Sequence, residues 1–361
     1  MTGNILGERF VVVSFGESHG RCVGALVDGC PPGLELSEED IQADLDRRRP
    51  GQSLVTTSRS EEDRVEILTG VFEGYTTGAP ILMLVWNKDV DSSPYRKLLN
   101  TPRPGHADYP ATVKYRGFSD WRGGGRFSGR ITAGYVMAGA VAKKLLHKTL
   151  GVEVLAYSLE IGGVRCPPVS IEEIRANRYS NEVRCPDLET AEEMRKVILE
   201  ARRNGDSVGG VVECIALNVP AGVGEPVFSS LDSDLSRALF SIPAVKGVEF
   251  GRGFESTRLR GSENNDAFTI SDGVVKTLTN NAGGILGGLS TGMPIQVRVA
   301  FKPASSISRP QKTVDLAKME ETEIVVPGRH DPSVVPRAVV VVEAVVAIVL
   351  ADHVLRAGLV R

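Results

Sequence analysis

The chain has 361 residues, of which 42% are hydrophobic and 24% are charged, a composition typical of globular proteins and unlike disordered or collagen-like chains. A formal net charge of -3 argues against a general nucleic-acid binder, because such proteins are usually basic. Five cysteines without a C-x-x-C pair favour reduced thiols in the cytoplasm over a disulfide framework. No basic segment followed by an apolar one stands at the start of the chain, so we expect no signal peptide.

The hydrophobic pattern predicts both helices and strands. In chain order we expect a strand at 11–15, a helix that begins after Ser37 and ends at Arg49, strands at 65–71 and 81–86, a helix at 131–150, a helix with a capping box at Thr190 that ends before Asn204, strands at 211–219 and 295–301, and a helix at about 334–356. Strands and helices do not alternate regularly, so we expect an α+β fold with antiparallel sheets rather than a doubly wound parallel one.

No linker or internal repeat divides the sequence, which favours a single domain over residues 1–361. The most apolar stretch, Ala338–Leu350, is shorter than the roughly 20 residues that span a bilayer, and Glu343 interrupts it. We therefore expect a buried core helix and no membrane segment.

Two histidines lie in loops rich in glycine or proline. His19 is in Gly16-Glu17-Ser18-His19-Gly20, directly after the first strand, and His106 is in the segment RPGHADYP. Glycine lets the backbone turn sharply near a ligand, and histidine is suited to proton transfer near neutral pH. The alternative is a strand-ending turn with a surface histidine.

A third loop, from Arg122 to Arg130, contains three consecutive glycines and leads into a helix. Backbone N–H groups with Arg126 and Arg130 suit a phosphate or carboxylate, although a flexible surface loop is the alternative. Later in the chain, Lys302 to Ser306 offers a cation, hydroxyls and exposed amides, a candidate phosphate site, and Asp331 follows Arg329.

Other polar groups carry less information. Arg47, Arg48 and Arg49 end a helix, where a solvated face explains them as well as a ligand does. No Cys, His, Asp or Glu spacing indicates a metal site. A Ser-His-Asp hydrolase is not excluded, but no nucleophile motif supports it.

Taken together, these segments resemble the chorismate synthase family over nearly the whole length. The resemblance rests on nine motifs in the family's order: FGESHG, DRRRPGQ, RPGHADYP, GGGRFSGR, GDSVGG, AVKGVEFG, NNAGGILGG, FKPASSI and GRHDP. It implies a β-α-β sandwich in each subunit, with antiparallel sheets packed around central helices, and a homotetramer.

The resemblance also implies the reaction, an anti-1,4-elimination of phosphate from 5-enolpyruvylshikimate 3-phosphate that gives chorismate and needs reduced FMN without net redox change. His19 would protonate the leaving phosphate, His106 would protonate the reduced flavin, and Asp331 would assist proton transfer at the flavin. The substrate would bind to Ser18, Arg48, Arg103, Arg130 and Arg329. FMN would bind to Arg126, Phe127, Ser128, Ala244, Gly287, Lys302, Pro303, Ala304, Ser305, Ser306 and Arg329.

The sequence departs from the family pattern at two positions. Phe127 stands where many members have a serine, so only its backbone can contact FMN. Leu54 stands where many members have an arginine, so that anion contact is missing or comes from a residue such as Arg59.

Two other functions remain open. An NAD(P)H-dependent flavin reductase is the alternative enzyme, although no dinucleotide fingerprint is present. A module that binds anions or RNA through the arginine loops is the non-enzyme alternative, and it predicts salt-sensitive affinity for polynucleotides.

Overall fold

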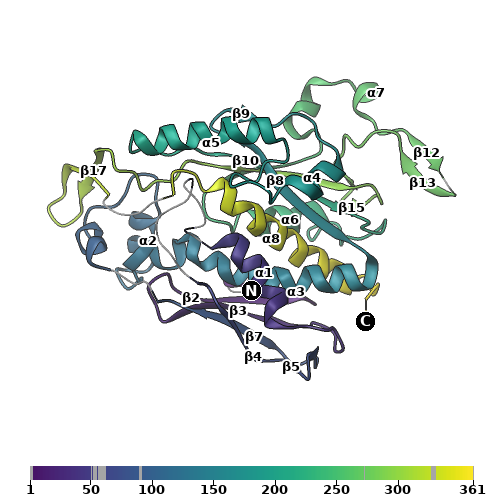
Figure 1. The fold of residues 1–361 in the computed structure, drawn as a ribbon, viewed down its shortest axis with the longest axis horizontal. Coiled ribbons are helices and arrows are strands. Elements are labelled where there is room, and N and C mark those ends of the chain that lie inside the picture. The colour runs from purple at the N-terminus through teal and green to yellow at the C-terminus, as the bar shows by residue number, and fades with distance from the viewer. Residues whose placement is uncertain are drawn as a thin grey trace.

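Two five-stranded antiparallel sheets enclose a layer of helices in the computed structural model (Figure 1). The structure describes residues 3–360 except 50, 52–54, 56–61, 89–91, 272 and 327–330. The first sheet has the order β1 (Ile5–Leu6), β2 (Val11–Gly16), β3 (Cys22–Asp28), β7 (Ile81–Trp86), β4 (Val65–Thr69). The second has the order β11 (Val245–Phe250), β16 (Ile295–Phe301), β10 (Gly210–Leu217), β8 (Glu153–Ile161), β9 (Val164–Arg165). The expected α+β class and sandwich are confirmed, because the strands of both sheets pair antiparallel on either side of the helix layer.

The helix layer consists of α1 (Glu38–Arg48), α3 (Thr132–Leu150), α6 (Leu231–Leu239) and α8 (Val335–Arg356). Helix α3 packs on β2, β3 and β7 of the first sheet, and α8 packs on β8 and β10 of the second. The two helices also pack against each other, so they join the sheets. Helix α5 (Leu188–Arg203) lies on the other side of the second sheet from α8, and α4 (Ile171–Asn177) lies beside β8 (Figure 1).

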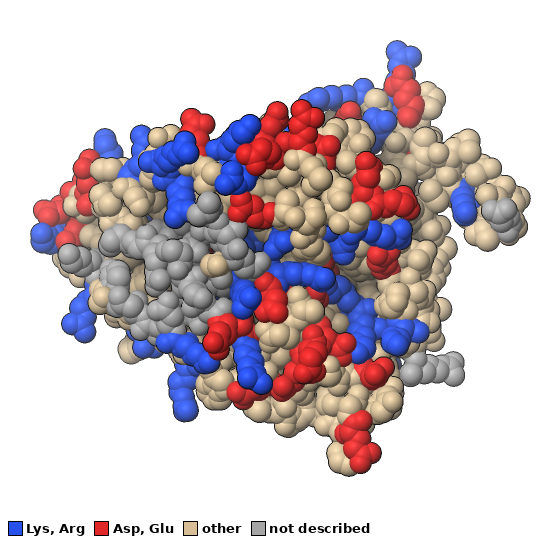
Figure 2. Space-filling view, viewed as in Figure 1, with Lys and Arg blue, Asp and Glu red and all other residues tan. Residues whose placement is uncertain are grey.

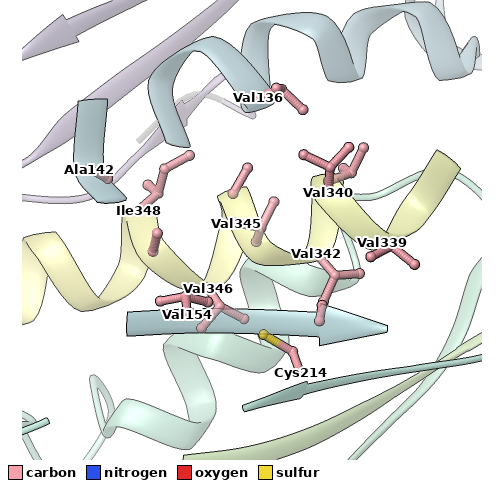
Figure 3. Packing of buried hydrophobic residues seen from close by; sticks show 14 of the residues in the cluster. Val136, Ala142, Val154, Cys214, Val339, Val340, Val342, Val345, Val346 and Ile348 are labelled. Carbon is pink, nitrogen blue, oxygen red and sulfur yellow. The ribbon is translucent and has the colours of Figure 1, made fainter. Parts of the chain in front are cut away.

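Apolar residues on almost every side of α8 explain its central position. Figure 3 shows Val340 and Val345 of α8 near Val136 of α3, while Val346 lies near Val154 of β8. A helix that is hydrophobic all round is stable only when it is buried on all sides. Although α8 has 22 residues and is long enough to cross a membrane, 94% of its most apolar window is buried within the fold. The expectation of a buried core helix is confirmed.

Short strands and helices lie in the segments that connect the main elements. They are β5 (Val71–Phe72), β6 (Tyr75–Thr76), η1 (Ser93–Leu98), α2 (Asp108–Lys114), η2 (Arg122–Phe127), η3 (Gly129–Ile131), η4 (Gly253–Arg258), α7 (Gly261–Asn264), β12 (Phe268–Ser271), β13 (Val274–Thr277), β14 (Ile285–Leu286), β15 (Leu289–Ser290), β17 (Gln311–Asp315) and β18 (Glu320–Ile324). The hairpin β12–β13 projects from the body beside α7 (Figure 1).

The predicted capping box at Thr190 is wrong. Helix α5 begins three residues earlier, at Leu188, and Asp187 instead of Thr190 is its N-cap. The Asp187 carboxylate accepts a hydrogen bond of 2.8 Å from the Thr190 N–H, so Thr190 occupies the third helical position. An aspartate at the N-cap satisfies a free N–H group as well as a threonine does, and here it begins the helix first.

Candidate active site

The triple-glycine loop in η2 brings both loop histidines to one place. Gly123, Gly124 and Gly125 have φ angles of 57°, 81° and 51°, which side-chain-bearing residues rarely adopt. A Cβ atom on Gly123 would lie 2.2 Å from Cδ2 of His19, and one on Gly124 would lie 3.3 Å from Cε1 of His106. The glycines therefore let the backbone lie directly against two imidazole rings.

The loop after β2 holds His19 inside the protein. Ser18 and His19 are 1% and 5% exposed, and the Ser18 N–H donates a hydrogen bond of 3.3 Å to the Gly125 carbonyl. Nδ1 of His19 lies 2.9 Å from Oγ of Ser92, and its ring meets Tyr95 edge-on with centroids 5.2 Å apart. His19 is therefore not the surface histidine of the alternative interpretation.

His106 shares one carboxylate with Arg103. Nδ1 of His106 lies 2.6 Å from Oδ1 of Asp108, and Nη2 and Nε of Arg103 each lie 2.8 Å from an oxygen of the same carboxylate. Burial alone would raise the pKa of Asp108, but hydrogen bonds from Arg103 and His106 outweigh it and hold that pKa well below its usual value. Asp108 is therefore an anion that orients two predicted site residues.

Two further arginines converge on the buried carboxylate of Asp63. Nη1 of Arg48 lies 2.9 Å from Oδ2 of Asp63, and Nη1 of Arg130 pairs with Oδ1. Burial opposes ionisation of Asp63, but both arginines lower its pKa below the usual value. Burial, and next the neighbouring cations Arg337 and Arg130, lower the pKa of Arg48 to about 9 despite Asp63, so Arg48 stays charged at neutral pH.

The arginine run at the end of α1 is divided between two environments. Arg47 and Arg49 have side chains that are 40% and 42% exposed, as expected of a solvated face, whereas the Arg48 side chain is 1% exposed. Arg48 also donates to the Gly129 carbonyl at 2.8 Å. Only Arg48 therefore belongs to the site.

Asn87 connects Arg130 to the loop that contains His19. Its amide donates to the carbonyls of Glu17 and Gly20 at 3.1 and 2.8 Å, and its oxygen accepts from Nε of Arg130 at 2.9 Å. The loop 122–130 is not a flexible surface segment, because Gly124, Gly125 and Arg130 are buried.

The segment Lys302–Ser306 lies next to the His106 loop. Ser306 accepts a hydrogen bond of 3.1 Å from Nη1 of Arg103, and Ser305 donates one of 2.7 Å to the Gly105 carbonyl. Nζ of Lys302 lies 2.6 Å from Oγ of Ser305, and its backbone N–H donates to the Ala244 carbonyl at 3.0 Å. Burial and, next, Lys246 lower the pKa of Lys302. A cation and two hydroxyls are thus held beside His106, while Pro303 and Ala304 supply the backbone between them.

Other predicted residues lie at the border of this cluster or away from it. Arg126 turns its guanidinium to the end of β2, where it donates to the Gly16 carbonyl at 2.9 Å, and the ring of Phe127 is 37% exposed. Ser128 caps η3 by accepting from the Arg130 N–H. Gly287 is in the β14–β15 turn, and a Cβ atom there would meet no described atom.

Asp331 lies on the Arg48 side of the cluster. Its carboxylate lies 2.5 Å from Nη1 of Arg337, whose Nε donates to the Arg48 carbonyl at 3.1 Å. The predicted ligand Arg329 lies outside the described residues, as do Leu54 and Arg59. No group of metal-ligating side chains that could hold an ion occurs in the described part of the chain.

Sequence reasoning missed Asp63, Asn87, Tyr95 and Asp108. Asp108 lies two residues after His106 within a motif that was singled out, so a carboxylate next to a loop histidine was an available signal. Asp63 has a φ of 48° and lies among ordinary charged residues, so its sequence context gives no comparable signal.

Basic side chains gather locally despite the acidic net charge. Lys and Arg form a band across the middle of the face in Figure 2, with Asp and Glu on both sides of it. The arginines of the candidate site are different, because Arg48, Arg103 and Arg130 are at most 6% exposed. Buried cations suit a small anion better than a polynucleotide, which needs an accessible surface.

Comparison with known proteins points in one direction. The family model described as chorismate synthase matches residues 10–355. A chorismate synthase of Korarchaeum cryptofilum is 58% identical over 356 residues, 99% of this chain and 98% of its own. One of Methanosarcina acetivorans is 58% identical over 361 residues, 100% of this chain and 98% of its own. A crystal structure of chorismate synthase superposes with a TM-score of 0.76 at 34% identity, covering 97% of this chain and 93% of that one.

Proposed function

The chain belongs to the chorismate synthase family, and we propose on that basis that it converts 5-enolpyruvylshikimate 3-phosphate into chorismate, a step of the shikimate pathway. In this reaction a C–O bond to phosphate and a ring C–H bond break and a C=C bond forms, with no net redox change. The observation that carries the proposal is the convergence of the buried His19, the half-buried His106 and three buried arginines on one glycine loop.

The charge of the site matches the substrate. A molecule with one phosphate and two carboxylates needs several cations, and Arg48, Arg103 and Arg130 supply them from inside the protein. Arg130 has a buried Nη2 without a hydrogen-bond partner among the described residues, so one charged donor is left for a ligand. Such charge-assisted hydrogen bonds are about twice as strong as neutral ones.

The two histidines have separate proton-transfer roles in the proposal. His19, beside Ser18 and the glycine loop, is the acid that protonates the departing phosphate. His106, on the side of Lys302–Ser306, holds or moves a proton at the cofactor. Asp331 assists from the Arg48 side. Their separate hydrogen-bond partners, Ser92 for His19 and Asp108 for His106, support different tasks.

The residues present fit reduced FMN. Lys302, Ser305 and Ser306 offer a cation and hydroxyls for a phosphate, and a Cβ atom on Gly105 would come within 3.3 Å of Oγ of Ser305. Ser128, Ala244 and the backbone of Phe127 complete the proposed set, with Arg126, Gly287 and Arg329 as its outer members. When bound, reduced FMN supplies electron density transiently to the reacting ring.

We also propose a single catalytic domain that assembles as a homotetramer in the cytoplasm. One hydrophobic cluster runs from the first sheet through the helix layer to the second, which supports a single domain. The projecting hairpin β12–β13 exposes Phe268, Ile270, Val274 and Val275, which supports self-association. All five cysteines are free thiols, in keeping with a reducing compartment.

The first test is anaerobic formation of chorismate with chemically reduced FMN, compared between the wild type and His106→Ala. We expect turnover that requires reduced flavin, and a loss of about 10²–10⁴-fold in the variant, typical of a missing general acid. His147→Ala is the control, because His147 lies near the end of α3. No turnover by folded protein that binds FMN would sink the proposal.

The flavin reductase alternative is not favoured by the comparisons. Steady oxidation of NADPH by the wild type with FMN and without substrate would support flavin reductase activity.

A further inference from the structure

The carboxylate of Asp108 contacts His106 and Arg103 in a way that constrains both. Oδ1 accepts from Nη2 of Arg103 at 2.8 Å and lies 2.6 Å from Nδ1 of His106. Oδ2 accepts from Nε of Arg103 at 2.8 Å and from its backbone N–H at 3.0 Å. Four donors therefore occupy the roughly four lone-pair positions of one carboxylate. Asp108 has little capacity left to bind a ligand itself, so it acts through its neighbours.

The short contact with Asp108 determines which ring nitrogen of His106 carries the proton. An ionised carboxylate only accepts hydrogen bonds, so Nδ1 at 2.6 Å must be the N–H nitrogen. In neutral His106, Nε2 is then the basic nitrogen, and it is the only ring nitrogen that can accept from Nη2 of Arg103, at 3.3 Å. The hydrogen bond at Nδ1 thus sets the chemistry at Nε2, as in other histidines oriented by a carboxylate.

The hydrogen bonds of Arg103 depend on the protonation state of the His106 ring. Its Nη2 is within 3.3 Å of both ring nitrogens, and its Nη1 donates to Ser306 at 3.1 Å. When Nε2 of His106 gains a proton, Nη2 loses its acceptor on the ring, and only Asp108 then holds the two cations together. The carboxylate therefore couples a substrate-binding arginine to a proton-transfer histidine.

We infer that Asp108 is a positioning residue that holds His106 as the Nδ1–H tautomer, with Nε2 as its working nitrogen, and fixes Arg103 beside it. The inference rests on the proposed function for the role of His106 in catalysis. The tautomer of His106, in contrast, can be measured in the protein without cofactor or substrate.

The test uses the full chain with ¹⁵N-labelled histidine and Asp108→Asn, whose side chain has the same shape but lacks the charge. Long-range ¹H–¹⁵N spectra at alkaline pH, without FMN, should show His106 of the wild type as the Nδ1–H tautomer. In the variant we expect the population to move toward the Nε2–H form that free histidine favours. The kcat of chorismate formation should fall by about 10²–10⁴-fold, the scale seen when a histidine loses its orienting carboxylate.

Glu153→Gln is the matched control, because Glu153 also pairs with an arginine, Arg175 at 2.7 Å, but stands at the start of β8 with a side chain that is 33% exposed. It should change neither the His106 signal nor kcat. If Asp108→Asn is recovered unfolded, Asp108→Ser, which also removes the carboxylate but has a smaller side chain, gives the same readout.

The outcomes separate the inference from the proposed function. An unchanged tautomer in Asp108→Asn overturns the inference whatever the activity. A changed tautomer with unchanged kcat overturns the positioning role while leaving the proposed reaction intact. A changed tautomer with a fall in kcat larger than the rise in KM supports the inference, because a merely structural role would not move the His106 signal. Absence of wild-type turnover would overturn the proposed reaction alone.

Discussion

Glu343 and Asp63 are both buried carboxylates that hold two cations, but they differ in what their partners have left to bind. Glu343 lies in the middle of α8 and is 1% exposed. It accepts from the Ala156 N–H at 2.9 Å and the Tyr179 hydroxyl at 3.0 Å, and it pairs with Arg178 and Lys143. Lys143 in turn pairs with Asp44 at 2.5 Å. This network ties α1, α3, α4 and α8 to the second sheet.

Asp63 holds Arg48 and Arg130 near the glycine loop. Here the network is incomplete, because Nη2 of Arg130 is buried and has no partner in the described parts of the chain. Buried charged groups are stable only when they are paired and hydrogen-bonded. A network whose donors are all satisfied stabilises the fold, whereas one with a charged donor left over at a glycine-lined loop has that donor available for an anion.

The largest effect that we expect to sharpen this contrast is the loss of stability in Glu343→Ala. The change removes the counter-charge of Arg178 and leaves Lys143 with Asp44 alone, which costs about 3–5 kcal/mol in the free energy of unfolding. Denaturant unfolding measures it, with Glu172→Ala as control, because the Glu172 side chain is 79% exposed and should not shift the midpoint. A loss of stability no greater than that of the control would contradict a stabilising role for Glu343.

Removing an arginine from each network should affect activity in one case and stability in the other. Arg130→Ala removes the unsatisfied donor but leaves Arg48 on Asp63, so we expect kcat/KM for chorismate formation to fall by about 10²-fold, equivalent to roughly 3 kcal/mol, with a smaller change in unfolding. Arg178→Ala should weaken the fold and leave kcat/KM nearly unchanged. Equal losses of activity in the two variants would break the contrast between the networks.

Two glycines offer a smaller and matched comparison. A Cβ atom on Gly139 would lie 2.3 Å from Cβ of Ala344, where α3 crosses α8, so Gly139→Ala should destabilise the protein by about 1–3 kcal/mol through overpacking. A Cβ atom on Gly123 would instead displace the His19 ring. Gly123→Ala should therefore lose activity out of proportion to its stability. The same ratio of activity to stability in both variants would contradict a catalytic role for the His19 contact.

Periodic patterns made much of the fold predictable from sequence. Strand β16 alternates between buried and half-buried residues, and α8 is apolar throughout, so both were expected. Strand β8 was missed because seven of its residues are buried, on both faces, which removes the alternation that marks a strand. The start of α5 was misplaced because Asp187 and Thr190 are both suitable caps.

The candidate site was predictable to the extent that its residues lie in motifs. His19, His106, Arg103 and Arg130 were found in glycine- or proline-rich loops, and the structure brings these loops together. Asp63 and Asn87 were not found, because their importance comes from long-range contacts: Asp63 meets Arg130, 67 residues away, and Asn87 meets Glu17, 70 residues away. No local pattern encodes such pairs, so only the folded chain reveals them.

The smallest expected effect is the pH dependence of Asp63. Because its pKa in the folded protein is lowered, its stabilising contribution is complete above the ordinary aspartate pKa of about 3.9 and is lost as the pH falls through the folded-state value. The difference in unfolding free energy between wild type and Asp63→Asn should therefore be constant near neutral pH and narrow below about pH 4. Val346→Ala, which removes a buried methyl pair from α8 and binds no proton, should differ from wild type by the same amount throughout. A gap for Asp63→Asn that stays constant or widens in acid would mean that Arg48 and Arg130 do not hold the carboxylate ionised, and the site would then lack the anion that orders its cations.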